Sequence, residues 1–150
     1  MDNYKWIVLL SLLFSFIAYA FSFQSFSPIL ASIATSYNVT HSKVGLVMSV
    51  VLIPGIFFNI PLGLLLKKYK AKQVGIISLV LIILGTFMAA TANSFNSILL
   101  GRLIFGIGGT FITLISYVII AQWFTKEELG KAMGIFGINM PLQQFQNRYA

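Results

Sequence analysis

The sequence predicts an all-α membrane protein, a polytopic transmembrane helix bundle with four complete spans and a partial fifth. Three observations support this fold class. The 150 residues are 58% hydrophobic and only 9% charged, whereas soluble domains carry about a quarter charged residues. The apolar residues form runs long enough to cross about 30 Å of hydrocarbon. The basic residues gather between those runs, which favours membrane orientation over nucleic-acid binding.

The first two predicted spans contain prolines. One long helix is expected over residues 6–36 and bends near Pro28, because a proline inside a membrane helix is tolerated but kinks it. We interpret this run as a retained span, since it is long for a signal sequence and no clear cleavage site ends it. A second span is expected over residues 44–66, with Pro54 and Pro61 inside it and a lysine cluster at its end.

The later spans are separated by shorter polar segments. A third span is expected over residues 74–92 and a fourth over residues 98–124, followed by a charged loop at residues 125–131. A fifth helix then begins, but its apolar character lasts only over residues 132–142. The tail after it is too polar to lie in lipid without many partners. We therefore interpret the chain as truncated within its fifth span, or as departing there from its natural course.

The distribution of basic residues predicts the orientation. Seven lysines fall on one side of the membrane and only Lys43 falls on the other. Cytoplasmic loops carry an excess of basic residues, so the N-terminus is expected in the cytoplasm. The seven are Lys5, Lys67, Lys68, Lys70, Lys72, Lys126 and Lys131.

Several kinds of chemistry have no support in the sequence. The chain has no cysteine and a single histidine, His41, so we expect neither a metal site nor a disulfide. The acids Asp2, Glu127 and Glu128 all lie outside the spans, and a proton-coupled mechanism would need a carboxylate beyond residue 150. No nucleophile, base and orienting group occur together, so we expect no catalytic residues and no cofactor.

Arg102 is the only ionisable side chain expected inside a span, where a charge costs at least about 2.5–3.5 kcal/mol. It begins a stripe with Gly106, Gly109, Thr113 and either Ser116 or Tyr117 at helical spacing. One interpretation makes this stripe a cavity wall, where the guanidinium meets a polar substrate or orders a neighbouring helix. The alternative is that Arg102 reaches the outer interface and the glycines allow close helix packing.

Other polar residues of the spans are weaker candidates for a cavity. Asn59 stands among small residues of the second span that favour packing, and a buried amide needs partners. Tyr19 and Gln24 are the candidates from the first span. The predicted substrate-cavity residues are therefore Arg102, Thr113, Tyr117, Asn59, Tyr19 and Gln24.

Three segments resemble the major facilitator superfamily. Gly63-Leu64-Leu65-Leu66-Lys67-Lys68-Tyr69-Lys70-Ala71-Lys72 resembles the loop signature G-x-L-x-D-R-x-G-R-[RK] between the second and third helices, with Lys67 at the acidic position. The segment from Arg102 to Gly109 resembles the fourth-helix pattern R-x-x-x-G-x-[GA]. Trp123-Phe124, followed by Gly130, Ala132 and Gly134, resembles the passage from the fourth helix to the fifth.

The resemblance implies a secondary transporter of two six-helix halves that moves a small molecule by alternating access. It implies a gating role for the signature loop at Gly63, Lys67, Lys68 and Lys72, and helix packing at Gly106, Gly109 and Gly134. Lys67 cannot supply the acid of the family pattern, so we expect Glu127 or Glu128 to pair with Lys67 or Lys68 in a charge-swapped arrangement. The implied partners are the lipid bilayer, the solute and the missing C-terminal helices of the transporter.

Two alternatives stay open at this point. The first alternative is a non-transporting four-span scaffold or regulatory subunit. The second is an inactive truncated product. Reading the coding DNA beyond codon 150 discriminates among them, because a transporter requires further apolar spans.

Overall fold

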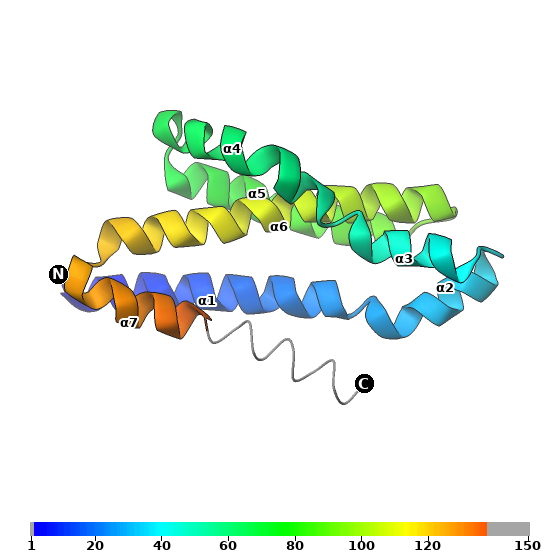
Figure 1. The fold of residues 1–150 in the computed structure, drawn as a ribbon, viewed down its shortest axis with the longest axis horizontal. Helices are drawn as coiled ribbons and strands as arrows, with labels where there is room; N and C mark the ends of the chain where they lie inside the picture. The colour runs from blue at the N-terminus through cyan, green and yellow to red at the C-terminus, as the bar shows by residue number, and fades with distance from the viewer. Residues whose placement is uncertain (1, 138–150) are drawn as a thin grey trace.

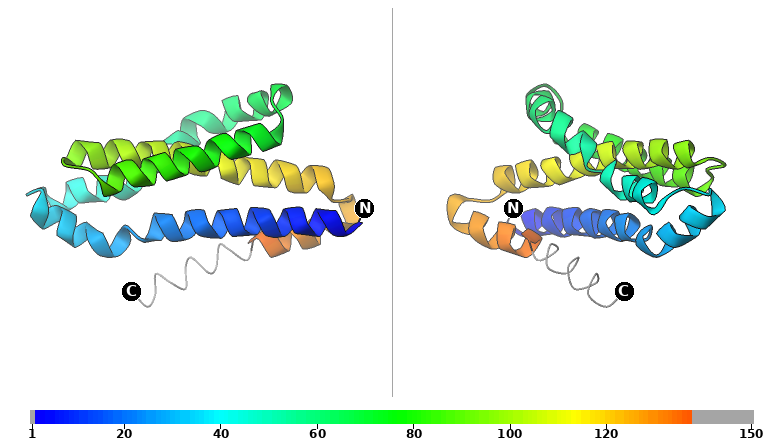
Figure 2. Two further views of the ribbon diagram at one scale, coloured as in Figure 1. Left: turned by 180° about the vertical axis from the view of Figure 1, so that it is seen from behind. Right: turned by 45° about the vertical axis from the view of Figure 1, so that its right-hand side comes forward.

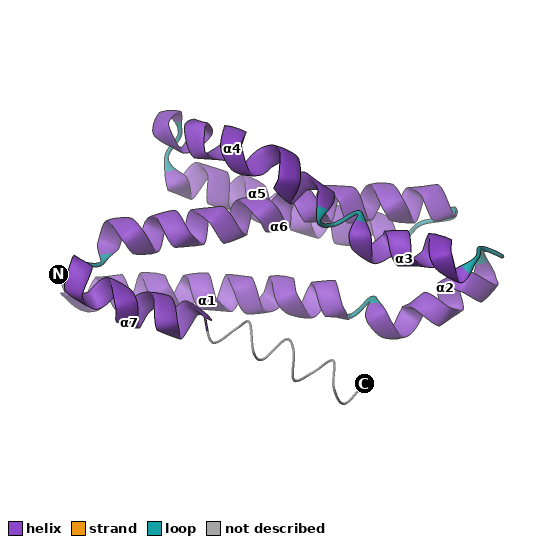
Figure 3. Cartoon of the chain, viewed as in Figure 1, coloured by secondary structure: helices purple, strands orange, loops and turns teal. Residues whose placement is uncertain are grey.

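A computed structural model describes residues 2–137, and all of the regular structure there is helical (Figures 1 and 3). The elements are α1 (Asp2–Gln24), the short 3-10 helix η1 (Ser27–Ile29), α2 (Leu30–Ser36), α3 (His41–Ser49), α4 (Ile53–Lys68), α5 (Ala71–Ala90), α6 (Phe95–Trp123) and α7 (Lys126–Gly137). Four stretches are long and apolar enough to cross a membrane: Tyr4–Ser36, Ser42–Pro61, Ala71–Ala90 and Phe95–Trp123. The predicted fold class is confirmed.

Helix α6 is the centre of the bundle. It contacts α1, α3, α4, α5 and α7. Within its most apolar stretch of 18 residues 44% is buried, against 17–22% of the corresponding stretch in the other three candidate spans. In Figures 1 and 2 successive long helices run in alternating directions along one long axis. The start of α1, the α4–α5 connection and the α6–α7 connection share one end of the bundle.

The first candidate span bends as expected. Helix α1 ends at Gln24, and the chain then passes through η1, which holds Pro28 near its start, into α2. The bend lets α2 pack against α3 through Ile33 and Val47, with Ile98 of α6 completing the cluster. The hydroxyl of Tyr37 donates to the carbonyl of Ala92 at 2.7 Å, which ties this corner to the α5–α6 turn.

The second candidate span is interrupted, a feature that the expected single run over residues 44–66 did not include. Residues 50–52 form a turn between α3 and α4, in which the Leu52 amide donates to the carbonyl of Ser49 at 3.0 Å. Pro54 follows at the second position of α4 and is buried. In a continuous helix the ring of Pro54 would clash with the carbonyl of Val50, four residues earlier. This clash explains why the helical hydrogen bonding of α3 stops at Val50.

Helices α5 and α6 pack closely along a glycine seam formed by Gly85, Gly101 and Gly108. A Cβ atom at Gly85 would lie 2.7 Å from the carbonyl oxygen of Gly101, and one at Gly108 would lie 2.7 Å from that of Ser78. Small residues let helix backbones approach in this way. These three glycines differ from Gly106 and Gly109, the two of α6 that are expected from the sequence to serve packing.

Helix α7 begins at Lys126, six residues before the expected start at residue 132, so the predicted charged loop at residues 125–131 is wrong. Thr125 and Glu128 form the S/T-x-x-E pattern of a helix start. The acids Glu127 and Glu128 lie in the first turn, where they complement the helix dipole. The expected residues 138–142 of the fifth span, and the polar tail after them, lie outside the described residues.

Candidate functional site

A cavity of about 340 Å³ opens between α1, the start of α4 and the middle of α6. Helix α6 crosses the bundle over 29 residues and contributes its central part to the wall. The turn that separates α3 from α4 borders the cavity through Val51 and Leu52. The lining residues are Tyr19, Val51, Leu52, Gly55, Asn59, Gly109, Thr110, Thr113, Leu114 and Tyr117.

The polar groups of this cavity are uncharged. They comprise the hydroxyls of two tyrosines and two threonines and the amide of Asn59. The hydroxyl of Thr113 donates to the carbonyl of Gly109 at 2.7 Å, and that of Thr110 donates to the carbonyl of Gly106 at 2.9 Å. Their oxygens therefore remain acceptors. Such a wall suits a small polar solute held by hydrogen bonds.

Gly109 allows Tyr19 to reach the wall of the cavity. A Cβ atom there would overlap the ring of Tyr19, so any larger residue would displace the tyrosine. The same ring stacks on Phe105 with centroids 5.1 Å apart. Gly106 plays a related part on the other side, because a Cβ atom there would collide with the backbone of Val51 at the α3–α4 turn.

The structure brings together four of the six side chains selected from sequence. Tyr19, Asn59, Thr113 and Tyr117 all line the cavity, whereas Gln24 and Arg102 do not. Gln24 is half-buried at the end of α1. Thr110, which follows the Gly108-Gly109 pair on α6, also lines the cavity and is not among the side chains predicted from sequence.

Arg102 is buried, with 1% of its surface exposed, and it contacts α3 and three phenylalanines. Its Nε donates to the carbonyl oxygen of Val47 at 3.2 Å, and its Nη2 lies 3.4 Å from the sulfur of Met48. The carbonyl of Val47 belongs to the last turn of α3, where carbonyls lack partners within the helix and the dipole is negative. The guanidinium carbon of Arg102 lies 4.3–5.3 Å from the ring centroids of Phe23, Phe26 and Phe105.

These contacts place Arg102 neither in the cavity wall nor at the outer interface. The guanidinium instead orders the end of α3. Three cation–π contacts and a charged hydrogen bond, at about 0.5–2 and 1.5–3 kcal/mol each, are able to offset the cost of the buried charge. One nitrogen, Nη1, is buried without a hydrogen-bond partner among the described residues.

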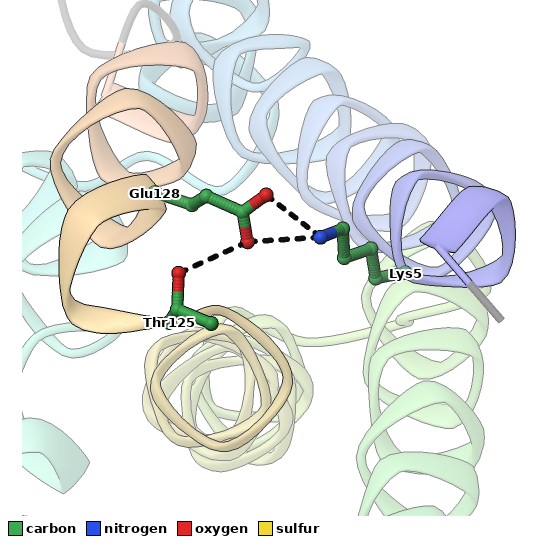
Figure 4. Close-up of polar contacts among 3 residues, drawn as sticks. All are labelled: Lys5, Thr125 and Glu128. Atoms are coloured by element: carbon green, nitrogen blue, oxygen red, sulfur yellow. Dashed lines mark hydrogen bonds and ion pairs between the residues drawn. The ribbon is translucent and has the colours of Figure 1, made fainter.

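The expected pairing of Glu127 or Glu128 with Lys67 or Lys68 involves side chains outside those that the structure describes. Among the described side chains, the carboxylate of Glu128 binds Lys5 (Figure 4). The Nζ of Lys5 lies 2.7 Å and 2.9 Å from the two carboxylate oxygens, and the hydroxyl of Thr125 donates to one of them at 3.3 Å. These bonds, that from Lys5 above all, hold the pKa of Glu128 below its ordinary value of 4.5. The ion pair joins the first turns of α1 and α7, which are far apart in sequence.

The other residues of the signature loop lie at the α4–α5 connection. Gly63 and Lys72 are exposed, and a Cβ atom at Gly63 would meet nothing within 4 Å. The same is true of Gly134 on α7, so the described residues offer this glycine no close neighbour. The structure does not describe the side chains of Lys67 and Lys68.

The fold and the cavity define an α-helical, multi-pass membrane protein with a polar site at the middle of its central helix. The model of the Major Facilitator Superfamily matches residues 12–142. The chain therefore belongs to this superfamily, as its three sequence motifs implied.

The curated relatives with similar sequences are transporters. The chain is 28% identical to the probable nitrate transporter NarT of Staphylococcus carnosus over 75% of its own length and 29% of the relative's. It is 30% identical to the nitrate/nitrite transporter NrtP of Picosynechococcus over 75% of this chain and 21% of that protein. It is 26% identical to the nitrite extrusion protein of Bacillus subtilis, over 74% and 28% respectively. The chain thus spans less than a third of the length of these relatives. No solved structure was found that matches it.

Proposed function

We propose that this chain forms part of the N-terminal half of a secondary transporter that moves a small solute across the plasma membrane by alternating access. The observation that carries the proposal is the cavity between α1, α4 and α6. Its walls come from three candidate spans and it lies at the middle of α6, and transporter sites lie near the bilayer midplane. Further segments of a longer transporter, of which this chain would be less than a third, would supply the opposite wall.

An interrupted helix at the cavity supports this interpretation. Helix α4 starts at the cavity with Leu52 and Gly55 in the wall, and the N-terminus of a half-helix carries the positive end of its dipole. Discontinuous helices of transporters point such ends at anionic substrate groups. Three relatives are named for nitrate or nitrite. We therefore propose nitrate and nitrite as the first substrates to test.

The orientation is also part of the proposal. The start of α1, which carries Lys5, lies with the α4–α5 connection and the start of α7 at one end of the bundle (Figures 1 and 2). This arrangement supports a cytoplasmic location for that end, because basic loops favour the cytoplasm.

Uptake by the product of the complete reading frame tests the proposal. Cells that express it should accumulate labelled nitrate or nitrite above a vector control, and Asn59→Leu or Thr113→Val should lower this uptake about tenfold or more. Thr86→Val is the matched control, because the hydroxyl of Thr86 also bonds within its own helix, to Ile82, but does not line the cavity. A frame without further spans, and uptake equal to the control for every solute tested, would favour the scaffold instead.

A further inference from the structure

The connection between α4 and α5 carries four of the ten basic residues of the chain within residues 67–72, here called the basic segment. Lys67 and Lys68 end α4, Lys70 precedes α5 and Lys72 lies in its first turn. Lys70 and Lys72 are exposed. This charge is not used by the cavity or by the Lys5–Glu128 pair.

Among the described side chains, no acid forms an ion pair with Lys70 or Lys72. The three acids of the chain are Asp2, Glu127 and Glu128, and none occurs between the second residue and α7. Glu127 and Glu128 lie on α7, which packs against α6 and α1. In Figures 1 and 2, α7 and the α4–α5 connection lie on opposite sides of α6 at the same end of the bundle. Glu128 is moreover bonded to Lys5.

Exposed apolar side chains and an exposed tyrosine surround the basic segment. Helix α4 presents Ile60 and Leu64 outward, 79% and 62% exposed, and α5 presents Ile76 and Ile77, 53% and 52% exposed. Tyr69, between the lysines, is 48% exposed, and tyrosine is enriched where hydrocarbon meets headgroups. Lys70 also precedes α5 without a capping hydrogen bond from its side chain.

We propose that the basic segment binds the headgroups of anionic phospholipids. The lysines supply the charge, Tyr69 lies at headgroup depth, and the outward apolar faces of α4 and α5 contact the acyl chains of the same lipids. Contact with one lysine raises the affinity for an anionic headgroup on the order of fivefold. This proposal concerns the lipid partner of the chain and does not depend on which solute is transported.

Fluorescence quenching by brominated lipids provides the test, with the full chain reconstituted in phosphatidylcholine vesicles. Tyr69→Trp is the reporter, in a background of Trp6→Phe and Trp123→Phe. We expect brominated phosphatidylglycerol to quench this reporter with roughly fivefold higher apparent affinity than brominated phosphatidylcholine. Concentrated salt should reduce the preference, because it screens exposed charges.

Two variants with the same change in net charge locate the effect. Lys70→Gln/Lys72→Gln should reduce the preference to about twofold or less. Lys126→Gln/Lys131→Gln removes two exposed lysines at the same end of the bundle, but these share α7 with two glutamates, so the preference should persist. Circular dichroism must show equal helix content in both variants.

Three outcomes would overturn the proposal. Equal quenching by the two lipids would show that the segment does not select anionic headgroups, and would leave an acidic protein segment as its partner. An equal loss in both double variants would reduce the effect to overall charge. Abolition of the preference by millimolar inorganic phosphate at constant ionic strength would indicate a site for a soluble anion.

Discussion

Arg102 illustrates how a charge is kept inside a membrane bundle. Its guanidinium bonds to the carbonyl of Val47 and is surrounded by three phenylalanines from α1, the following turn and α6. The carbonyl it satisfies is one that the α3–α4 interruption leaves without a helical partner. The arginine and the broken helix therefore compensate each other.

Replacing Arg102 by alanine should lower the stability of the bundle by about 2–4 kcal/mol, because it removes the cation–π contacts and leaves a buried carbonyl unsatisfied. Arg102→Lys should recover only part of the loss, since an ammonium lacks the planar guanidinium that stacks on the rings. Thermal unfolding in detergent measures both. Lys126→Ala, at an exposed position, is the control. Wild-type stability in Arg102→Ala would contradict the structural role.

The Lys5–Glu128 pair should make stability depend on pH. The pKa of the Glu128 carboxyl is lowered in the folded protein, mainly by the bond from Lys5. The pair therefore stabilises the fold above the ordinary pKa of 4.5, and this contribution is lost as the pH falls through the lowered value. Glu128→Gln should unfold at a lower temperature than the wild type at neutral pH and should lose less on acidification.

Thermal unfolding followed by circular dichroism, from neutral pH to about pH 3, measures this difference. Glu127→Gln is the matched control, because Glu127 is exposed, lies next to Glu128 and carries the same charge. The charge-exchanged variant Lys5→Glu/Glu128→Lys should recover part of the lost stability. Identical pH profiles for the two glutamine variants would exclude a specific pair.

At the scale of elements, close packing and interruption both shape the bundle. The glycine seam brings α5 against α6, while Pro54 breaks the second candidate span and allows its turn to border the cavity. Gly106 fits the backbone of that turn against α6. The shape of the cavity thus depends on the lack of a side chain at Gly106 of α6 and on the break in helical hydrogen bonding that Pro54 causes before α4.

The glycine seam can be tested with a control on the same helix. Gly85→Ala should destabilise the bundle by about 1–3 kcal/mol, because its Cβ would meet backbone atoms of α6 that cannot move independently. Gly75→Ala, also on α5, meets nothing within 4 Å and should be neutral or stabilise by up to about 1 kcal/mol. Unfolding temperatures in detergent compare them. Equal effects of the two substitutions would show that the seam is not tightly packed.

At the scale of the whole molecule, the alternation of the helices sets the topology. The predicted orientation is testable because the chain has no cysteine, so one introduced thiol is labelled alone. Ser42→Cys, at the start of α3, should react with a membrane-impermeant maleimide on intact cells. Lys72→Cys should react only after permeabilisation. Both positions are exposed, and the reverse pattern would invert the proposed topology.

Local pattern was sufficient for the number of candidate spans, the bend at Pro28 and the polar residues worth testing. Hydropathy and proline effects arise from neighbouring residues, and so they are visible in one sequence. The start of α7 was missed although its signal was local: the charges of Glu127 and Glu128 were interpreted as a loop, whereas the first turn of a helix favours acids.

The sequence by itself thus determined that this protein is a helical membrane bundle with basic connections, because transfer into lipid depends on composition summed over a run of residues. Only the tertiary structure decided that Arg102 orders α3, that Glu128 pairs with Lys5, and that Tyr19, Asn59, Thr113 and Tyr117 share one cavity. Each of those outcomes depends on the rotation and separation of helices that are distant in the chain, and periodicity within one helix carries no information about its neighbours.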